Sequence, residues 1–243
     1  MLLTAMRRPW LDWHALMELA RKESVLIVLL LIISGLLLGF GSLAEEVLEG
    51  DTAKLDEHVI GLFRDPADPS RPLGPAWLLE AMRDLTSLGS TLFLALVFLL
   101  VLVYFLIARK KAAALFFAVA VLGGQAVSTL LKLLVDRPRP PLPDWAPRVV
   151  TASFPSGHSM LSAVTFLTIG ALLSRVEPRP ALRVYFVAVA VLLTVLVGAS
   201  RVYLGVHWPT DVLAGWALGS AWALICWTAA LWLQGRGKVE PPG

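Results

Sequence analysis

Long apolar runs separated by short polar segments dominate the pattern of this chain. Six of these runs hold about 20 mostly apolar residues each, which is the length that an α-helix needs to cross the hydrocarbon core of a bilayer. They cover residues 24–43, 90–108, 112–134, 157–174, 183–204 and 211–233. The pattern therefore predicts an all-α integral membrane bundle of six helices, and we expect residues 1–243 to form a single membrane domain.

The first run has an alternative interpretation, a cleaved signal peptide, because residues 42–44 resemble a cleavage site. Its apolar core of about 20 residues exceeds the usual length of about 7 to 15, and the acidic Asp12 and Glu18 precede it. These features favour a membrane span.

The segment 44–89, between the first two runs, is too polar to span a membrane. We expect two short helices here, one capped by Asp51 and one started by Pro75. Their apolar positions are Leu55, Val59, Leu62 and Phe63 in the first helix and Leu78, Met82 and Leu85 in the second. Helices of this kind lie in the membrane interface, where these two either pack against the bundle or gate the entry of a substrate.

Lysine and arginine residues near the ends of the runs predict the orientation, since such residues are retained on the cytoplasmic side. One face of the predicted bundle carries Arg7, Arg8, Arg21, Lys22, Arg109, Lys110, Lys111, Arg175, Arg179, Arg183, Arg236 and Lys238. We therefore expect a multi-pass protein of the cell membrane with both termini in the cytoplasm. The opposite, extracytoplasmic face carries a second set that defies the rule: Lys132, Arg137, Arg139, Arg148 and Arg201.

Composition agrees with a membrane protein. The hydrophobic content of 57% and the mean hydropathy of +0.74 lie well above the values of soluble domains. The net charge of +3 is small and dispersed, so we expect membrane lipids and no nucleic acid as partners. The one cysteine, Cys226, lies inside an apolar run, which excludes an intrachain disulfide and a thiolate metal site.

Three polar clusters interrupt the apolar runs, and the alternating direction of the helices brings all three to the extracytoplasmic face. The first cluster, residues 132–140, places Lys132 in the last turns of a helix and Arg139 just beyond its end. A lysine point charge and an arginine fork together suit a phosphate. Structural cations at a helix C-terminus are the alternative.

The second cluster has the sequence Pro-Ser-Gly-His at residues 155–158, where a helix is predicted to begin. Ser156 is placed to cap this helix, and Gly157 lets an anion approach the backbone N–H groups at its positive end. His158 then stands in the first turn, beside such an anion. Alone, the motif would be an ordinary helix cap, but the cations on the same face favour an anion site.

The third cluster joins the fifth and sixth runs. Gly205 is expected to end the preceding helix, which leaves Arg201 on its last turn. Pro209 suits the first turn of the next helix, so that His207 lies just before it. Asp211 then accepts a hydrogen bond from one imidazole nitrogen of His207 and leaves the other as an unprotonated nucleophile or base.

Two histidines and an aspartate on one face also suggest a metal site, because catalytic zinc uses three protein ligands of this kind. Lys132, Arg139 and Arg201 would repel a dication at the same place. We therefore expect neither a metal nor another cofactor.

These clusters resemble the motifs of the type 2 phosphatidic acid phosphatase family, which includes bacterial lipid phosphate phosphatases and shares its site with vanadium haloperoxidases. The family pattern is K-x6-R-P, then P-S-G-H, then S-R-x5-H-x3-D. Every spacing is met here, by Lys132 with Arg139 and Pro140, by Pro155 to His158, and by Ser200, Arg201, His207 and Asp211. The similarity covers the third to sixth runs closely, whereas residues 1–90 match only in having a first span and a polar outer segment.

The resemblance implies a metal-independent hydrolase that removes the terminal phosphate from a lipid mono- or pyrophosphate. In such an enzyme His207 would attack phosphorus to form a phosphohistidine, Asp211 would orient it, and His158 would protonate the leaving oxygen. The phosphoryl oxygens would be held by Lys132, Arg139, Arg201, Ser156 and the amide of Gly157.

Two further arginines bear on the substrate. Arg137 also precedes a proline, and it suits either a salt bridge or a second phosphate, for which Arg148 is another candidate. These spare cations favour undecaprenyl pyrophosphate over phosphatidylglycerophosphate or phosphatidic acid. The alternatives to a phosphatase are a lipid carrier or flippase that retains a phosphate-binding site, and a vanadate-dependent haloperoxidase-like enzyme.

Overall fold

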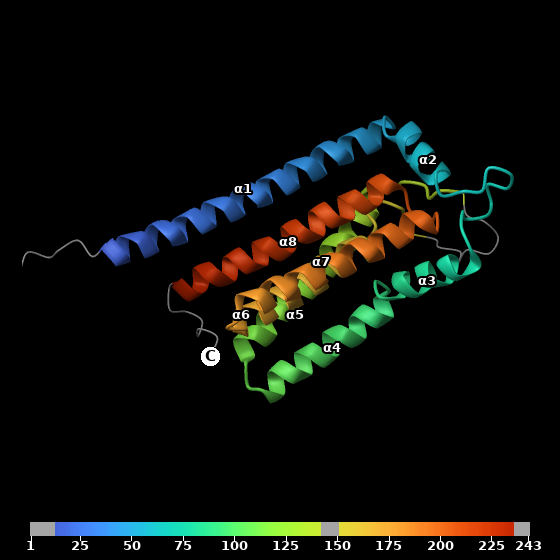
Figure 1. Ribbon diagram of the computed structural model, residues 1–243. Helices are drawn as coiled ribbons and strands as arrows, with labels where there is room; N and C mark the ends of the chain where they lie inside the picture. The colour runs from blue at the N-terminus through green and yellow to red at the C-terminus, as the bar shows by residue number, and fades with distance from the viewer. Residues whose placement is uncertain (1–12, 142–150, 236–243) are drawn as a thin grey trace, which may run out of the picture.

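The computed structural model describes residues 13–141 and 151–235, and it folds them into eight α-helices (Figure 1). The helices are α1 (Trp13–Glu49), α2 (Ala53–Gly61), α3 (Ala76–Ser87), α4 (Thr91–Ile107), α5 (Lys111–Leu134), α6 (Gly157–Val176), α7 (Pro180–Tyr203) and α8 (Pro209–Gly235). Five of them are long and apolar enough to cross a membrane, and a sixth span results if α3 and α4, which meet at 46°, are counted as one. The prediction of an all-α membrane protein is confirmed.

The helix α6 lies at the centre of the bundle, where it packs against α4, α5, α7 and α8. Of its most apolar window, 56% is buried inside the protein, compared with 6% for α1. The helix α1 instead lies against the outer side of α8 (Figure 1). Its exposed leucines and isoleucines therefore face the surrounding lipid.

Small residues let α6 and α8 approach each other closely. A Cβ atom at Gly215 of α8 would lie 2.7 Å from the carbonyl oxygen of Ser156, and one at Gly219 would lie 2.5 Å from that of Met160. These two glycines are four residues apart and so lie on one face of α8. Their close contact brings the first turn of α6, with its Pro-Ser-Gly-His motif, beside the first turn of α8.

The polar segment between α1 and α4 contains the two short helices that its pattern predicts, but α2 differs in detail. Asp51 does not cap α2, because the helix begins after Thr52 and neither residue bonds its first turn through a side chain. The buried side of α2 is also not its apolar side. Leu55 and Leu62 are both 59% exposed, whereas Asp56 is completely buried.

The helix α3 and the preceding loop pack against the C-terminal end of α7. Leu78 and Met82 of α3 contact a small cluster that includes Tyr203. The guanidinium of Arg64 donates a 2.8 Å hydrogen bond to the Tyr203 carbonyl, and Gly205, with φ of +69°, leaves room for it. Of the two roles open for this segment, packing against the bundle is the one that these contacts support.

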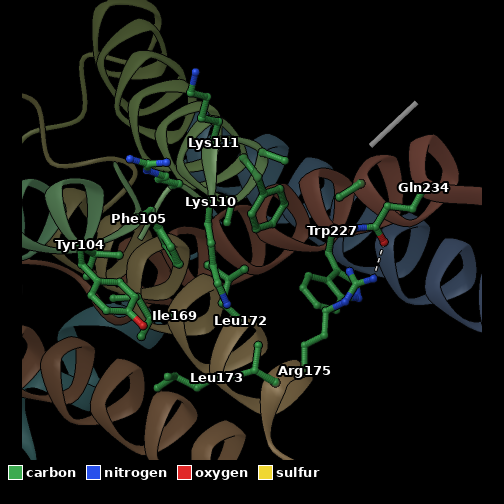
Figure 2. Close-up of a pocket in the computed structure, with 17 residues that line it drawn as sticks. Tyr104, Phe105, Lys110, Lys111, Ile169, Leu172, Leu173, Arg175, Trp227 and Gln234 are labelled. Atoms are coloured by element: carbon green, nitrogen blue, oxygen red, sulfur yellow. Dashed lines mark hydrogen bonds between the residues drawn. The ribbon is translucent and has the colours of Figure 1, made fainter. Parts of the chain in front are cut away.

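At the opposite end of the bundle lies a pocket of about 350 Å³ between the ends of α4, α6 and α8 and the start of α5 (Figure 2). Its lining combines apolar side chains with Arg109, Lys110, Lys111 and Arg175. The two ends of the bundle therefore both collect positive charge.

We expect Gly219→Ala to destabilise the protein by about 1–3 kcal/mol, because the added methyl group would force the α6 backbone at Met160 to shift. Thermal unfolding in detergent micelles measures the loss. Gly39→Ala is the matched control, since a Cβ at Gly39 of α1 would meet nothing within 4 Å. Equal unfolding temperatures for the two variants would contradict this account of the α6–α8 contact.

Candidate active site

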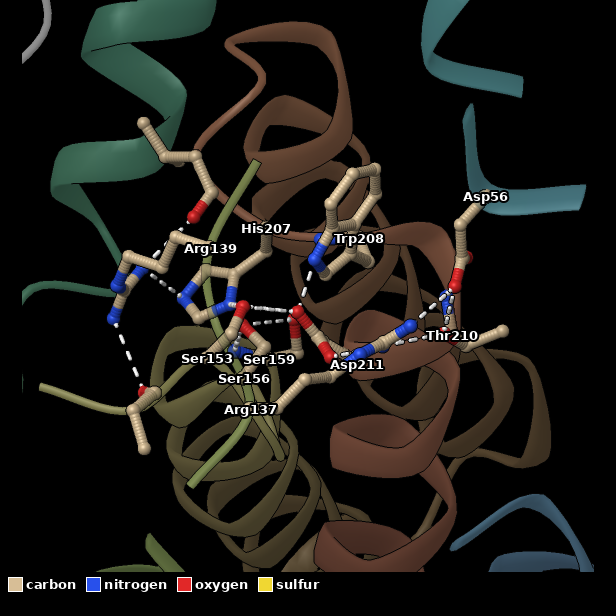
Figure 3. A network of polar contacts seen from close by, with 12 residues as sticks. Asp56, Arg137, Arg139, Ser153, Ser156, Ser159, His207, Trp208, Thr210 and Asp211 are labelled. Atoms are coloured by element: carbon tan, nitrogen blue, oxygen red, sulfur yellow. Dashed lines mark hydrogen bonds and ion pairs between the residues drawn. The ribbon is translucent and has the colours of Figure 1, made fainter. Parts of the chain in front are cut away.

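The three polar clusters meet at one end of the bundle, as their placement in the sequence predicts (Figure 3). Lys132 lies in the last turn of α5, Ser156 caps α6, and Arg201 lies in the last turn of α7. His207 follows in the connection between α7 and α8, 3.0 Å from Arg139 when measured between Nε2 and Nη1. Residues up to 75 positions apart in the chain therefore share one site.

The two ring nitrogens of His207 have different surroundings. A guanidinium can only donate, so the contact from Arg139 requires a lone pair on Nε2 and places the proton of a neutral ring on Nδ1. Nδ1 faces Oδ2 of Asp211 at 3.4 Å and the hydroxyl of Ser153 at 3.3 Å. This is the tautomer of a nitrogen nucleophile at Nε2.

Burial keeps His207 neutral. The side chain is almost completely enclosed, and this loss of hydration lowers the pKa of the imidazole to about 3. The positive charges of Arg201 and Arg139 lower the pKa further, while the hydrogen bond and charge of Asp211 oppose them. The ring therefore stays neutral, with one proton, throughout the physiological range.

Asp211 is held by donors on both of its oxygens. The direct contact with His207 is long, and Oδ2 receives closer bonds from the Ser153 hydroxyl and from the backbone N–H of Trp208 at 2.9 Å. Oδ1 receives a 2.6 Å bond from Nη1 of Arg137. Asp211 therefore faces Nδ1 of His207 from a fixed position, and Ser153 is a second partner of both groups.

Arg137 lies between two buried carboxylates. Its Nη2 is 2.7 Å from Oδ2 of Asp56, and its Nη1 is 2.6 Å from Oδ1 of Asp211. The guanidinium also stacks on Trp208, 5.7 Å from the ring centroid. Of the two roles left open for Arg137, these contacts support the salt bridge. Arg148, the other candidate for a second phosphate, lies outside the described residues.

Asp56 reaches the site from α2. Its Oδ1 accepts from the backbone N–H of Thr210 at 3.0 Å, and its Oδ2 accepts from the hydroxyl of the same residue at 2.6 Å. Figure 3 shows the resulting chain of contacts from Asp56 through Arg137 and Asp211 to His207. The sequence carries no signal for this role, because Asp56 is far from every motif.

Three cations lie in this part of the site, Arg139 in contact with His207 and Lys132 and Arg201 close to Arg139. Arg139 is held by the carbonyl oxygens of Val206 at 2.8 Å and Thr151 at 3.0 Å, and partial burial lowers its pKa. The ammonium of Lys132 donates to the carbonyl of Ala152 at 3.0 Å. These neutral partners orient the two side chains without cancelling their charge.

Arg201 is the most enclosed of these cations, with 8% of its surface exposed. Its Nη1 donates to the hydroxyl of Thr86 in α3 at 2.8 Å. Among the residues that the structure describes, nothing accepts from its Nε. A buried guanidinium that lacks an acidic partner is costly, so this position favours an anion.

The start of α6 completes the site. The Ser156 hydroxyl accepts from Ser159 and so caps the helix as predicted, and its own proton is left to donate. At Gly157 a Cβ atom would lie 4.0 Å from the Lys132 ammonium. The bare backbone of this residue therefore faces the same space as the cations, which suits an anion at the helix N-terminus.

His158 lies in the first turn of α6, against the corner between α3 and α4. A Cβ atom at Gly89, in that corner, would lie 3.3 Å from Cβ and Cδ2 of His158. Within residues 13–141 and 151–235, the ring of His158 makes no hydrogen bond. The same residues contain no group of three histidine, cysteine or acidic side chains that could hold a metal ion.

Comparisons with known proteins place this geometry among membrane phosphatases. Residues 111–234 match the model of the PAP2 superfamily. Over 148 residues the chain is 37% identical to phosphatidylglycerophosphatase B of Bacillus subtilis. This alignment covers 59% of this chain and 70% of that protein. The chain is also 39% identical over 74 residues to the undecaprenyl-diphosphatase of Sulfolobus acidocaldarius. That alignment covers 30% of this chain and only 32% of that protein.

A solved structure supports the same placement. The crystal structure of a transmembrane PAP2 type phosphatidylglycerolphosphate phosphatase from Bacillus subtilis superposes with a TM-score of 0.70 and 29% sequence identity. The match covers 86% of this chain and 97% of that chain. The helices outside the matched family region therefore also have counterparts in a solved membrane phosphatase.

The state of His207 is testable by NMR on ¹⁵N-histidine-labelled protein in micelles. We expect a neutral ring with its proton on Nδ1 from about pH 8 down to about pH 5, since a lowered pKa shifts protonation to more acidic conditions. The spectrum of His207→Asn assigns the signal. A titration midpoint near the ordinary value of about 6.5 would show that the site does not suppress protonation.

We expect Asp56→Asn to lower both stability and activity, although Asp56 is remote from every motif. Loss of one buried carboxylate leaves Arg137 undercompensated, which should cost about 3–5 kcal/mol. Asp211 would then be held less firmly by Arg137, which should lower kcat by about tenfold or more. Glu57→Gln, which removes an exposed carboxylate from the same helix, is the control for thermal unfolding and kinetics. Parallel behaviour of the two variants would refute the anchoring role of Asp56.

Proposed function

Because this chain belongs to the PAP2 superfamily of membrane lipid phosphatases, we propose that it hydrolyses a lipid phosphate through a phosphohistidine at His207. The observation that carries this proposal is the contact between Arg139 and Nε2 of His207. It presents the lone pair of a neutral imidazole to a group of cations. A phosphoryl group bound by those cations would lie within reach of the nitrogen.

The first step transfers the phosphoryl group. A phosphoryl oxygen competes with Nε2 for the Arg139 guanidinium, so substrate binding frees the lone pair to attack phosphorus. The new N–P bond forms as the bond from phosphorus to the lipid oxygen breaks, and His158 donates a proton to that oxygen. Asp211 stabilises the positive charge that the phosphorylated imidazole carries.

The second step releases phosphate. His158, now unprotonated, takes a proton from a water molecule whose oxygen attacks phosphorus. The N–P bond breaks, its electron pair returns to Nε2, and His207 is neutral again. Within the described residues the His158 ring makes no hydrogen bond. This suits a group that exchanges protons with substrate and water.

Fixed cations supply the charge stabilisation in this scheme. Lys132, Arg139 and Arg201 face one space, and the amide of Gly157 and the hydroxyl of Ser156 add neutral donors. Donors held in place by protein carbonyls need little reorganisation when charge develops on the phosphoryl oxygens. We therefore propose catalysis without a metal ion, in which Asp211 and Asp56 pair with Arg137 and do not bind a metal.

The comparisons support a glycerophospholipid phosphate as the first substrate to test. One curated relative and one solved structure, both from Bacillus subtilis, are phosphatases named for phosphatidylglycerophosphate or phosphatidylglycerolphosphate. The preference for undecaprenyl pyrophosphate rested on Arg137 and Arg148 as spare cations. Because Arg137 is paired with two carboxylates, we propose phosphatidylglycerophosphate ahead of undecaprenyl pyrophosphate and phosphatidic acid.

Phosphate release in detergent, with excess EDTA present, tests the function. We expect the wild type to retain its activity and His207→Asn to lose about a thousandfold or more, because the nucleophile is removed. His58→Asn, which changes an exposed histidine of α2, is the control. Loss of wild-type activity on chelation would refute the metal-free mechanism, and an active His207→Asn would refute the phosphohistidine.

The same assay, run on phosphatidylglycerophosphate, phosphatidic acid and undecaprenyl pyrophosphate, ranks the substrates by kcat/KM. A higher value for the pyrophosphate would overturn our order. Binding of these lipids without any phosphate release would instead favour a carrier that retains the site.

A further inference from the structure

The pocket at the other end of the bundle is a second site with its own chemistry. It is remote from the catalytic residues, because α6 carries His158 in its first turn and Arg175 in its last. At 1.5 Å of rise per residue, those positions are about 25 Å apart. The pocket therefore cannot hold the phosphoryl group that His207 attacks.

Positive charge in this pocket is not balanced by acidic side chains of the residues that the structure describes. Arg109, Lys110, Lys111 and Arg175 line it, and no acidic side chain does. Within the described part of the chain, none of these four residues forms an ion pair with a carboxylate. Arg175 instead donates to the amide oxygen of Gln234 and stacks on Trp227, 5.4 Å from the ring centroid.

The start of α5 adds donors to the same place. Residues 111–113 form its first turn and line the pocket, and the N–H groups of such a turn lack partners within their own helix. The N-cap residue, Lys110, makes no capping bond with its side chain. Figure 2 shows this side chain extending into the pocket toward Leu172, whereas Lys111 points away.

The remaining walls are apolar and aromatic. Phe105, Phe116, Ile169, Leu172 and Trp227 come from four different helices and enclose much of the 350 Å³. A volume of this size lies in the range of small-molecule sites. A ligand that satisfies the whole pocket needs an anionic head for the cations and an aliphatic part for these walls.

We propose that this pocket binds an anionic phospholipid from the adjacent leaflet. The phosphate lies between Lys110, Arg175 and the first turn of α5, and one acyl chain packs against Ile169 and Leu172. Retention of cations at one side of a membrane explains their number, but not a cavity between them. Basic pockets between membrane helices are suited to lipid headgroups.

Native mass spectrometry of the full chain in detergent tests the proposal with two probes, dioleoyl phosphatidylglycerol and dioleoyl phosphatidylcholine. We expect the wild type to prefer the anionic lipid, and Lys110→Gln combined with Arg175→Gln to bind it about tenfold more weakly. The control, Arg179→Gln with Arg183→Gln, removes the same charge from the neighbouring start of α7. It should bind like the wild type.

A second variant separates the pocket from general surface charge. Leu172→Trp keeps every cation but fills the apolar part, so it should also weaken binding of phosphatidylglycerol. Unfolding temperatures without lipid show that each variant is folded, and added phosphatidylglycerol should raise this temperature in the wild type and control only.

Three results would overturn the proposal. Equal binding of the two lipids by the wild type would show that the charge of the lipid has no role. Full binding of phosphatidylglycerol by Leu172→Trp would show that the lipid binds outside the pocket. A dimer that the Lys110 and Arg175 changes dissociate, without a lipid preference, would identify a second copy of the chain as the occupant. None of these readouts depends on phosphatase activity.

Discussion

The placement of Arg137 between Asp56 and Asp211 is the interaction on which the site depends. Both carboxylates are fully enclosed, and 12% of the arginine side chain is exposed. Charges at this depth are tolerated only when each finds its partner, so none of the three can turn away without leaving another unpaired. The planar guanidinium faces both acids at once, a geometry that a lysine could not reproduce.

This interaction also determines where α2 lies. The apolar side chains Leu55 and Leu62 are exposed, so the helix is not anchored by a buried apolar stripe. Asp56 instead connects it to Arg137 and to Thr210 at the start of α8. A segment outside the three motifs thereby becomes part of the support for Asp211, and through Asp211 for the imidazole of His207.

Pairing Asp211 with Arg137 has an electrostatic consequence for the phosphoryl site. Asp211 is the acid nearest to His207, and its charge is already offset by Arg137. Among the residues that the structure describes, Lys132, Arg139 and Arg201 therefore have no acidic partner of their own, which gives this part of the site excess positive charge. A phosphate group carries the charge that such a site lacks, and the neutral His207 adds no competing cation.

The sequence was sufficient for the spans, the three clusters and their meeting at one end, because apolar run length and motif spacing are local properties. It was insufficient for Asp56, Ser153 and Thr86, whose roles arise from contacts across large separations. The apolar pattern of α2 gave no sign that Asp56 is the buried residue of this helix. A helix at a membrane boundary can leave leucines exposed to lipid and bury a carboxylate, which reverses the rule for soluble helices.

The two basic ends of the bundle show why one is suited to catalysis and the other to binding. Arg139 and Lys132 are fixed by carbonyl oxygens, and Arg201 is enclosed, so their donors are already held in place. Lys110 at the other end has no such fixed partner among the described residues, and no histidine lines that pocket. Preorganised charge lowers the energy of a transition state, whereas adaptable charge beside an apolar wall suits the binding of an anionic amphiphile. The arrangement of partners around the cations, more than their number, therefore separates the chemistry of the two ends.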